Sequence, residues 1–516
     1  MAFDAGQQGR LPAPEQGRAR FGSGALPAIL VANAADPGCP PIRPGDTAPL
    51  ETQFPDMSAR SLQASVLVRW FLFAALGISV TGFVAPSTLM YTLAAFVAFA
   101  FFAITMLRGA GIYEVLSAGS FRRSSEEERQ YERHVRDDLP RYAVLVALYE
   151  EAAVVDQILA ALDALDYPKD RLQISLIVEE ADSETRMALG RHEHGPHIRV
   201  VVVPEGVPRT KPRALNYALT SAVGEYVVVY DAEDLPEPDQ LRRALWLLAR
   251  DPDNTACVQA RLDIYNAKQS FFTRQFTIEY CALFKAILPA LERFGLPVPL
   301  GGTSNHFPRH ILELAGRWDA FNVTEDADLG IRLARLGYKV KVLSSTTWEE
   351  APPTFAIWIG QRTRWLKGWM QTYLVHMRRP ASLWRDLGTF RFLGFQVLMG
   401  GMILSALVHP WFYVGLCYSL VIHGGLPFAA HGRPDDWLLP LAAFNLLAGY
   451  VSAMLLGALA VSTRRGDAGC DQLAWRVLAM PVYWLLISFA GYRALWQLAT
   501  SPFDWEKTPH VGCGEQ

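Results

Sequence analysis

Apolar residues are gathered into long stretches near the two ends of the chain, with a polar region between them. A helix that crosses a bilayer needs about 20 predominantly apolar residues. A buried core helix can imitate one such stretch, but it does not explain five at the two ends of a chain. The pattern therefore predicts a membrane-embedded protein. The five stretches are 64–84, 88–107, 392–422, 437–462 and 473–497.

The region between residues 109 and 389 has a different pattern, in which short apolar runs alternate with helical periodicity. Such alternation predicts a parallel sheet with helices on both faces, which is an α/β, Rossmann-like domain. The runs are 142–148, 172–178, 200–203 and 226–230, and the helical patterns include 154–165 and 213–222.

These patterns divide the chain into five parts. Residues 1–60 are rich in Gly, Pro and Ala, lack a signal-peptide pattern, and are expected to be a disordered tail. Two transmembrane helices at 61–108 precede the α/β domain at 109–389, which includes an interfacial helix near 355–378. A membrane region at 390–499 follows, with three or four segments because 392–422 is broken at His409-Pro410. Residues 500–516 form a final tail.

Composition narrows the class of protein. The 516-residue chain is 51% hydrophobic with a formal net charge of -3, so it lacks the basic face expected of a nucleic-acid-binding protein. The six cysteines form no CxxC pair and indicate neither a zinc site nor a disulfide framework. Arg122-Arg123 and Arg464-Arg465 follow apolar stretches and favour the cytoplasmic side.

Acidic residues follow three of the four predicted strands. Glu151, Glu180 and Asp231 stand at these ends, and Tyr149 follows the first strand. In open α/β sheets the ligand binds at the carboxyl edge of the strands. Carboxylates there suit a ribose, a base edge or a metal ion carrying a phosphate. The alternative is that they cap the helices that follow.

The segment Asp231-Ala232-Glu233-Asp234 offers a site for a divalent cation. Two carboxylates where a strand opens into a loop can reach one ion, and Mg2+ or Mn2+ prefers oxygen ligands. The second ligand beside Asp231 is either Glu233 or Asp234. Lys211, just before the helical pattern 213–222, lies where anions are favoured and is a candidate contact to phosphates.

Two further motifs carry candidate chemistry. Thr324-Glu325-Asp326 precedes a helical pattern at 329–336, so Glu325 and Asp326 are either helix-capping groups or a general base that takes a proton from a substrate hydroxyl. In Gln361-Arg362-Thr363-Arg364-Trp365, on the predicted helix 355–377, Arg364 can clamp a diphosphate and Trp365 can support a sugar ring. The alternative is an amphipathic helix on a membrane surface.

In this order, the motifs between residues 140 and 380 resemble the processive family-two inverting glycosyltransferases, which include cellulose, chitin, hyaluronan and curdlan synthases. The resemblance implies a GT-A-type domain that uses a UDP-sugar and a divalent metal. It implies that Tyr149, Glu151 and Glu180 contact the uridine, Lys211 the diphosphate, Asp231 and Glu233 the metal, and that Asp326 is the base. It implies acceptor or diphosphate contacts by Gln361, Arg364, Trp365, Ser304, Asn305 and His306, and pocket gating by Trp505, Lys507 and Thr508.

The resemblance predicts a bacterial inner-membrane enzyme with a cytoplasmic catalytic domain, which extends a β-linked polysaccharide. Two alternatives are the transfer of a single sugar to a membrane lipid, such as diacylglycerol or polyprenyl phosphate, and an inactive receptor or scaffold. Three C-terminal crossings would put residues 505–510 on the wrong side for gating, so we expect one stretch to be split or interfacial. Sugar, linkage and any export or accessory subunits are not readable from the sequence.

Overall fold

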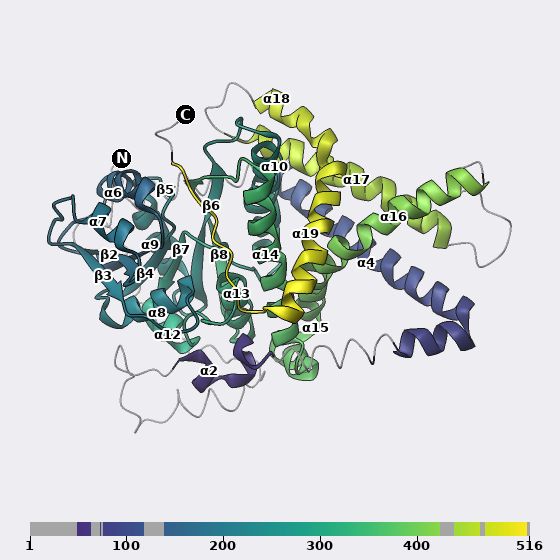
Figure 1. The fold of residues 1–516 in the computed structure, drawn as a ribbon, viewed down its shortest axis with the longest axis horizontal. Helices are drawn as coiled ribbons and strands as arrows, with labels where there is room; N and C mark the ends of the chain where they lie inside the picture. Colours follow the sequence, from purple (N-terminus) through teal and green to yellow (C-terminus); the bar gives the residue numbers. More distant parts are fainter. Residues whose placement is uncertain are drawn as a thin grey trace, which may run out of the picture. The chain divides into compact units, whose positions relative to one another are not determined.

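The middle of the chain folds around an eight-stranded sheet (Figure 1). The computed structural model describes residues 49–62, 73, 76–117, 139–423, 438–464 and 470–512. The strand order is β3-β2-β1-β4-β7-β6-β8-β5. The strands are β1 Tyr142–Leu148, β2 Leu172–Glu179, β3 Ile198–Val203, β4 Tyr226–Tyr230, β5 Leu235–Pro236, β6 Thr255–Ile264, β7 Asn305–Pro308 and β8 Lys339–Glu349.

The sheet is mixed rather than fully parallel. The four strands predicted from the sequence, β1 to β4, run parallel, as expected. β7 is antiparallel to both β4 and β6, while β6 and β8 are parallel. β7 has four residues, so its pattern is too short to be recognised in the sequence. The α/β fold class is confirmed, and the parallel sheet is corrected to a mixed one.

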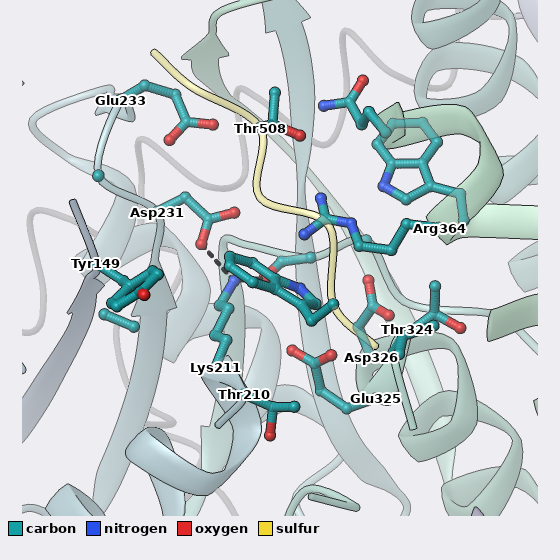
Figure 2. Close-up of a pocket in the computed structure, with 18 of the residues that line it drawn as sticks. Tyr149, Thr210, Lys211, Asp231, Glu233, Thr324, Glu325, Asp326, Arg364 and Thr508 are labelled. Atoms are coloured by element: carbon teal, nitrogen blue, oxygen red, sulfur yellow. Dashed lines mark hydrogen bonds and ion pairs between the residues drawn. The ribbon is translucent and has the colours of Figure 1, made fainter. Parts of the chain in front are cut away.

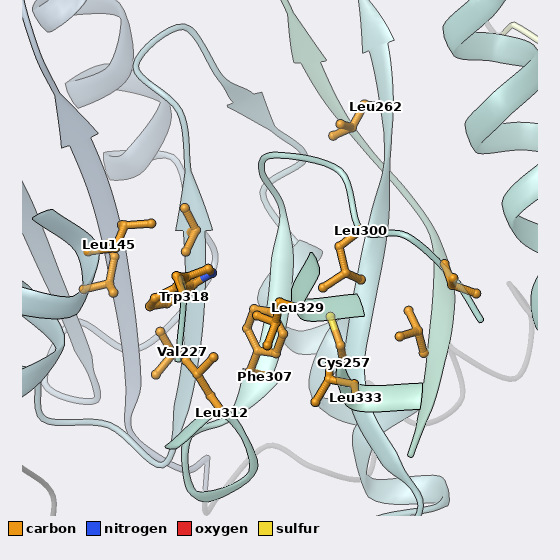
Figure 3. Close-up of a cluster of buried hydrophobic side chains, with 14 of the residues drawn as sticks. Leu145, Val227, Cys257, Leu262, Leu300, Phe307, Leu312, Trp318, Leu329 and Leu333 are labelled. Carbon is orange, nitrogen blue, oxygen red and sulfur yellow. The ribbon is translucent and has the colours of Figure 1, made fainter. Parts of the chain in front are cut away.

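Helices cover both faces of the sheet, because central strands such as β1 and β4 bury apolar side chains on both sides. α6 (Val155–Asp163) and α9 (Gln240–Arg250) contribute to one apolar core. α8 (Lys211–Ser221), α10 (Phe271–Ala282) and α13 (Glu325–Arg335) contribute to the other, part of which Figure 3 shows. Shorter helices are η3 Ala152–Val154, α7 Ser183–Leu189, the π-helix η4 Leu283–Ile287, α11 Leu288–Arg293 and α12 Arg309–Leu314.

Three helical segments among the described residues are long and apolar enough to cross a membrane: Pro86–Leu116, Pro380–Ile422 and Leu473–Thr500. Most of the predicted stretch 64–84 lies outside the described residues. The helices in these regions are α4 Pro86–Leu116, α15 Pro380–Phe395, the π-helix η5 Gln396–Gly400, α16 Gly401–His423, α17 Leu438–Ser462, α18 Cys470–Trp475, η6 Arg476–Ala479 and α19 Met480–Thr500.

Polar contacts join the apolar helices α4 and α17. Asn445 Nδ2 on α17 donates to the carbonyl oxygen of Ala98 on α4 at 2.7 Å. Arg108 on α4 donates to the carbonyl oxygen of Gly449 on α17 at 3.0 Å. α4 and α17 therefore pack together although 341 residues separate Arg108 from Gly449.

The helix α19 lies beside α14 (Phe355–His376) rather than among α4 and α17 (Figure 1). Near the start of both helices, Trp358 Nε1 donates to Tyr483 Oη at 3.0 Å. Just beyond the end of α19, the carbonyl oxygen of Ser501 accepts from Lys367 of α14 at 3.3 Å. Both ends of α19 are therefore held against the domain that contains the sheet.

Residues 49–62 are ordered into short helices, which differs from the disordered tail predicted for 1–60. They form α2 Leu50–Gln53, η1 Pro55–Met57 and η2 Ala59–Ser61. Leu50 and Ala59 are buried, so this polar-looking segment has its own contact with the domain. Residues 1–48 lie outside the described residues.

Candidate active site

A cavity opens at the carboxyl ends of β1, β2 and β4, and α8, α13 and α14 border it (Figure 2). It brings together most of the predicted site residues, which come from segments more than 350 residues apart in the sequence. Those that line it are Tyr149, Glu151, Lys211, Asp231, Glu233, Glu325, Asp326, Gln361, Arg364, Trp365, Trp505 and Thr508.

Lys211 connects two sides of this cavity. It is the first residue of α8, which Pro212 helps to start because proline suits the first turn of a helix. Its ammonium group forms an ion pair with Asp231 and donates to the carbonyl oxygen of Gly302 at 2.7 Å. Burial opposes the charge, but Asp231 and Glu325 outweigh it and raise the pKa of Lys211. A fixed positive charge thus faces the cavity where an anionic group would be favoured.

The structure separates the roles of Glu233 and Asp234. Asp234 is fully buried and accepts from the backbone N–H of Asp231 at 2.7 Å and from the Thr303 hydroxyl, so it holds the loop. Glu233 lines the cavity, and its buried Oε2 has no hydrogen-bond partner. Burial raises the pKa of Glu233 to about 7.

The carboxylates of the cavity fit a divalent ion that takes most of its ligands from substrate and water. Among the described residues, no three acidic, His or Cys side chains are grouped closely enough to hold a metal by themselves. Mg2+ commonly binds through one or two carboxylates together with substrate phosphates and water. Asp231 and the unpartnered oxygen of Glu233 match that pattern.

Glu325 and Asp326 form the first turn of α13, with Thr324 at the N-cap position. The Thr324 side chain makes no capping hydrogen bond, while the carboxylates benefit from the positive end of the helix dipole. Burial raises the pKa of Asp326 to about 6, and burial together with Asp326 raises that of Glu325 to about 7. Both values suit groups that exchange protons near neutral pH.

Gly302 lies between the two acidic sides of the cavity. A Cβ atom at this position would be 3.6 Å from Asp326 Oδ2 and 3.7 Å from Asp231 Oδ2. A larger side chain would fill the space that both carboxylates face. The absence of a side chain at Gly302 therefore keeps room for a ligand between Asp231 and Asp326.

The Gln361 to Trp365 segment lies within α14, which packs into the domain. Gln361 is 8% exposed and Arg362 is 5% exposed, which does not fit a helix that only rests on a membrane surface. Trp365 stacks on Tyr280, with ring centres 6.1 Å apart and an interplanar angle of 23°. These two rings and Trp369 give one side of the cavity an aromatic lining.

The C-terminal segment 501–512 runs across the cavity (Figure 2). Trp505 covers the Arg364 guanidinium, with 4.9 Å between the guanidinium carbon and the ring centre. Lys507 does not line the cavity; its Nζ donates to the carbonyl oxygen of Glu150 at 2.6 Å and lies 3.3 Å from Glu151 Oε1. The segment therefore contacts both the Arg364 side and the Glu151 side.

His510 belongs to this segment and was not among the predicted site residues. Its Nδ1 lies 3.0 Å from Glu151 Oε1, and its Nε2 lies 3.2 Å from Glu233 Oε1. Burial lowers its pKa, but the two carboxylates outweigh burial and raise it to about 9. His510 is therefore a cation that bridges two predicted ligand-binding carboxylates.

Glu180 does not reach the cavity, and its neighbour Glu179 takes that place. Side chains alternate along a strand, so at the end of β2 Glu179 faces the cavity while Glu180 is exposed to solvent. Arg213 forms an ion pair with Glu179 at 3.1 Å. The prediction that Glu180 faces the ligand cavity is therefore wrong, and Glu179 lies there instead.

Ser304, Asn305 and His306 are not in an acceptor-facing loop. Asn305 and His306 begin β7 in the middle of the sheet, and all three side chains are buried outside the cavity. Tyr142 Oη lies 2.8 Å from His306 Nδ1, and burial lowers the pKa of His306 to about 3, so this histidine is neutral. Gly301 and Gly302, just before them, are the residues that line the cavity.

Glu349 and Glu350 line the cavity but were missed, because the sequence pattern did not reveal β8. Glu349 and Glu350 stand at the end of β8, where the strand-end argument would have found them if β8 had been recognised. The Glu350 carboxylate accepts the N–H groups of Val511 and Gly512 at 3.0 and 2.9 Å. Further lining residues that were not predicted include Arg209 just before α8, Tyr280 on α10 and Trp369 on α14.

Comparison with known proteins shows the class of enzyme to which this chain belongs. Residues 140–368 match the family model described as glycosyltransferase like family 2. The chain is 30% identical over 321 residues to "Probable glycosyltransferase YdaM" of Bacillus subtilis (strain 168), which covers 60% of this chain and 75% of that relative. The chain therefore belongs to the family-2-like glycosyltransferases and is an enzyme of that class, with a GT-A-type catalytic fold.

The names of two other relatives refer to different kinds of product. A "Beta-monoglucosyldiacylglycerol synthase" of Synechocystis sp. (strain ATCC 27184 / PCC 6803 / Kazusa) is 31% identical over 50% of this chain and 55% of its own length. A "Poly-beta-1,6-N-acetyl-D-glucosamine synthase" of Staphylococcus epidermidis is 26% identical over 53% and 63%. The chain thus spans little more than half the length of these two relatives.

A solved structure with a similar arrangement is the "Mannosyltransferase PcManGT from Pyrobaculum calidifontis in complex with GDP-Man and Mn2+". It has 20% sequence identity and a TM-score of 0.44, and the match covers 76% of this chain and 98% of the other.

Proposed function

We propose that this chain is a membrane-embedded, inverting glycosyltransferase that moves a sugar from a UDP-sugar to a growing β-linked polysaccharide. The observation that carries the proposal is the space beside Gly302, which Asp231 and Asp326 face from opposite sides. A sugar held there would have its diphosphate near Asp231 and its reacting carbon near Asp326.

Residues on the sheet side of the cavity would bind the different parts of the UDP-sugar. Tyr149, Glu151 and Glu179 would contact the nucleoside, and Lys211 would hold the diphosphate. Asp231 and Glu233 would hold Mg2+ or Mn2+, which supplies positive charge that stabilises the leaving diphosphate. Trp505 must move for Arg364 to reach the phosphates, because its ring covers the guanidinium.

Asp326 acts as the general base. Its carboxylate accepts the proton of an acceptor hydroxyl while that oxygen bonds to the anomeric carbon. The bond between that carbon and the diphosphate oxygen breaks on the opposite face, and UDP leaves with that electron pair. Attack from the face opposite the leaving group inverts the configuration, so an α-linked donor yields a β-linked product.

The acceptor would lie on the aromatic side of the cavity. Trp365, Tyr280 and Trp369 offer flat apolar faces, which suit the CH-rich faces of sugar rings. Several rings in one wall favour an acceptor that is itself a chain of sugars.

The arrangement of α19 supports a topology with a cytoplasmic C-terminal segment. Its two ends contact the catalytic domain, and its exposed apolar residues recur at helical spacing along one face. This pattern is typical of a helix that lies in the membrane interface. If α19 lies in the interface of a bacterial inner membrane, α16 crosses the membrane outward and α17 crosses it back. Residues 505–510 are then on the cytoplasmic side, where they reach the donor cavity. The exposed residues are Val482, Leu485, Phe489, Tyr492, Leu495 and Trp496.

The test is a donor screen with product analysis. Membranes that contain the protein are incubated with labelled UDP-sugars and Mg2+ or Mn2+, and the products are separated into organic-soluble and polymeric fractions. We expect label in a polymer that a β-specific glycosidase degrades. Transfer of label to single-sugar lipids only, with every donor, would contradict polysaccharide synthesis.

A second candidate is transfer of one sugar to a membrane lipid. It is favoured by the 31% identity to a relative named as a monoglucosyldiacylglycerol synthase. Both functions need the same donor cavity beside the bilayer. Organic-soluble product with added diacylglycerol would support this candidate.

A further inference from the structure

The ordered segment 49–62 docks on the loop that leads to Asp326. Leu50 is 1% exposed, and a Cβ atom on Gly316 would lie 2.5 Å from its Cδ1, so a side chain at Gly316 would displace Leu50. Arg60 lies over the Phe321 ring at 5.3 Å. The contact is therefore close-packed at both ends of the loop segment 316–321.

The polar centre of this contact is Asp319. Ser58 Oγ donates to Asp319 Oδ1 at 3.0 Å, and the backbone N–H of Ala59 donates to Asp319 Oδ2 at 2.6 Å. Asp319 is fully buried and has one further donor, the N–H of Phe321 at 3.1 Å. A buried carboxylate needs such donors, because water cannot replace them without opening the loop. Two of its three hydrogen bonds thus come from a segment 260 residues away.

A continuous set of hydrogen bonds leads from Asp319 to the catalytic helix. Asn322 Nδ2 donates to Thr372 Oγ1 at 2.9 Å, and Val323 N–H donates to Gln371 Oε1 at 3.2 Å. Both partners are on α14. The backbone N–H of Thr324 then donates to Asn322 Oδ1 at 3.0 Å, directly before Glu325 and Asp326.

The same segment is fixed to the other side of the loop as well. Arg378, beyond the end of α14, donates to the carbonyl oxygens of Asp56 at 2.9 Å and Ser58 at 3.3 Å. The ring of Phe321 also packs on Phe503 of the C-terminal segment, with centres 5.6 Å apart. The loop 316–323 is therefore held between both ends of the chain and α14.

We propose that Ser58 and Ala59 are positioning residues for glycosyl transfer, because they fix Asp319 and thereby the loop that sets the place of Asp326. This inference rests on the proposed role of Asp326 as the base. A displacement of about 1 Å at a reacting group is enough to lower turnover by orders of magnitude. Donor binding depends on Tyr149, Lys211 and Asp231, none of which this segment contacts.

The segment 49–62 also links the base-bearing loop to the first predicted membrane stretch. Its last described residue, Leu62, lies directly before the apolar stretch 64–84. The first membrane stretch and the base-bearing loop are thus connected through a few residues. The segment 49–62 and the catalytic domain must also lie on the same side of the membrane, which requires an even number of crossings between residues 62 and 139.

The test uses the full-length protein in detergent or nanodiscs. The double variant Ser58→Ala/Ala59→Pro removes the hydroxyl and the N–H that Asp319 accepts. We expect turnover to fall about tenfold or more, UDP affinity to stay within about twofold, and amide hydrogen exchange over 319–326 to become faster. Ser58→Thr/Ala59→Pro keeps the hydroxyl and should restore turnover to the level of Ala59→Pro alone. Asp56→Asn, which removes an exposed ion pair with Arg379 in the same segment, is the matched control.

Wild-type turnover and exchange in the double variant would overturn the proposal. If the double variant loses UDP binding together with its fold, Asp319→Asn decides, since it keeps the side-chain shape and weakens the same contacts. A folded Asp319→Asn protein with unchanged exchange and turnover also overturns the proposal. Failure of wild-type protein to transfer any sugar would instead reject the proposed function, while the exchange measurement would still report on the contact.

Discussion

His510 Nε2 lies 3.2 Å from Glu233 Oε1, inside the donor cavity. His510 is cationic at neutral pH, since its pKa is raised to about 9. A metal ion that binds the free Oε2 of Glu233 is therefore repelled by a cation that already pairs with the same carboxylate. We expect His510→Ala to bind Mn2+ about threefold to tenfold more tightly, as roughly 1 kcal/mol of competing interaction is removed.

Electron paramagnetic resonance of free Mn2+ measures this affinity directly. His192→Ala is the control, because His192 contacts the exposed Asp156 and neither residue lines the cavity. An unchanged or weaker Mn2+ affinity in His510→Ala would show that Glu233 is not a metal ligand.

Gly302 offers a graded test of the space between the two carboxylates. An alanine Cβ would lie 3.6 and 3.7 Å from the nearest oxygens of Asp326 and Asp231, which is ordinary contact, so Gly302→Ala should keep most activity. Gly302→Val would add two methyl groups to this space and should lower kcat/KM by about 100-fold or more. The Tm of both variants should stay near wild type. A fully active Gly302→Val enzyme would place the reacting sugar elsewhere.

The pH dependence of kcat/KM should have an acidic limb between about pH 6 and 7. Burial raises the pKa of Asp326 to about 6 and that of Glu325 to about 7, and the two titrate as a pair. A base acts only when deprotonated, so the rate should fall about tenfold per pH unit below this limb. UDP binding followed by fluorescence or calorimetry over the same range controls for loss of donor affinity. A rate that is flat down to pH 5 would exclude a buried carboxylate as the base.

Arg362 should contribute to stability rather than to substrate contact. It donates to both carboxylate oxygens of Glu279 at 2.8 and 2.7 Å and to Tyr483 Oη at 2.9 Å, which joins α10, α14 and α19. Arg362→Ala should destabilise the protein by roughly 2–4 kcal/mol, because it leaves Glu279 without its charged partner.

Thermal unfolding in detergent measures this effect. Arg385→Ala, at a side chain that is 70% exposed, should change stability by about 0.5 kcal/mol or less. Equal Tm values for the two variants would contradict the assigned role of Arg362.

Much of the site could be predicted from the sequence, because its residues follow recognisable elements. Asp231 ends an apolar strand, Asp326 begins a patterned helix, and Arg364 lies on a long helix, so local pattern and order were sufficient. The fold class followed from β1 to β4 in the same way.

The remaining residues depend on contacts that no local pattern records. His510 reaches Glu151 across 359 residues. His306 was misplaced because β7 is a short antiparallel strand between β4 and β6, which turns an expected loop into the interior of the sheet. Nothing in the sequence around Ser58 and Ala59 marks them as ordered, because their contacts are with the distant residues Asp319 and Arg378.

The proposed glycosyl transfer depends most directly on Asp326. Wild-type protein and Asp326→Asn are compared for transfer from a labelled UDP-sugar with Mn2+ and for UDP binding, and the anomeric configuration of the product is determined. We predict a β-linked product from wild type, and from Asp326→Asn a loss of turnover of about 1,000-fold or more with UDP affinity retained. Turnover of Asp326→Asn at the wild-type level, or a product with retained configuration, would contradict the account.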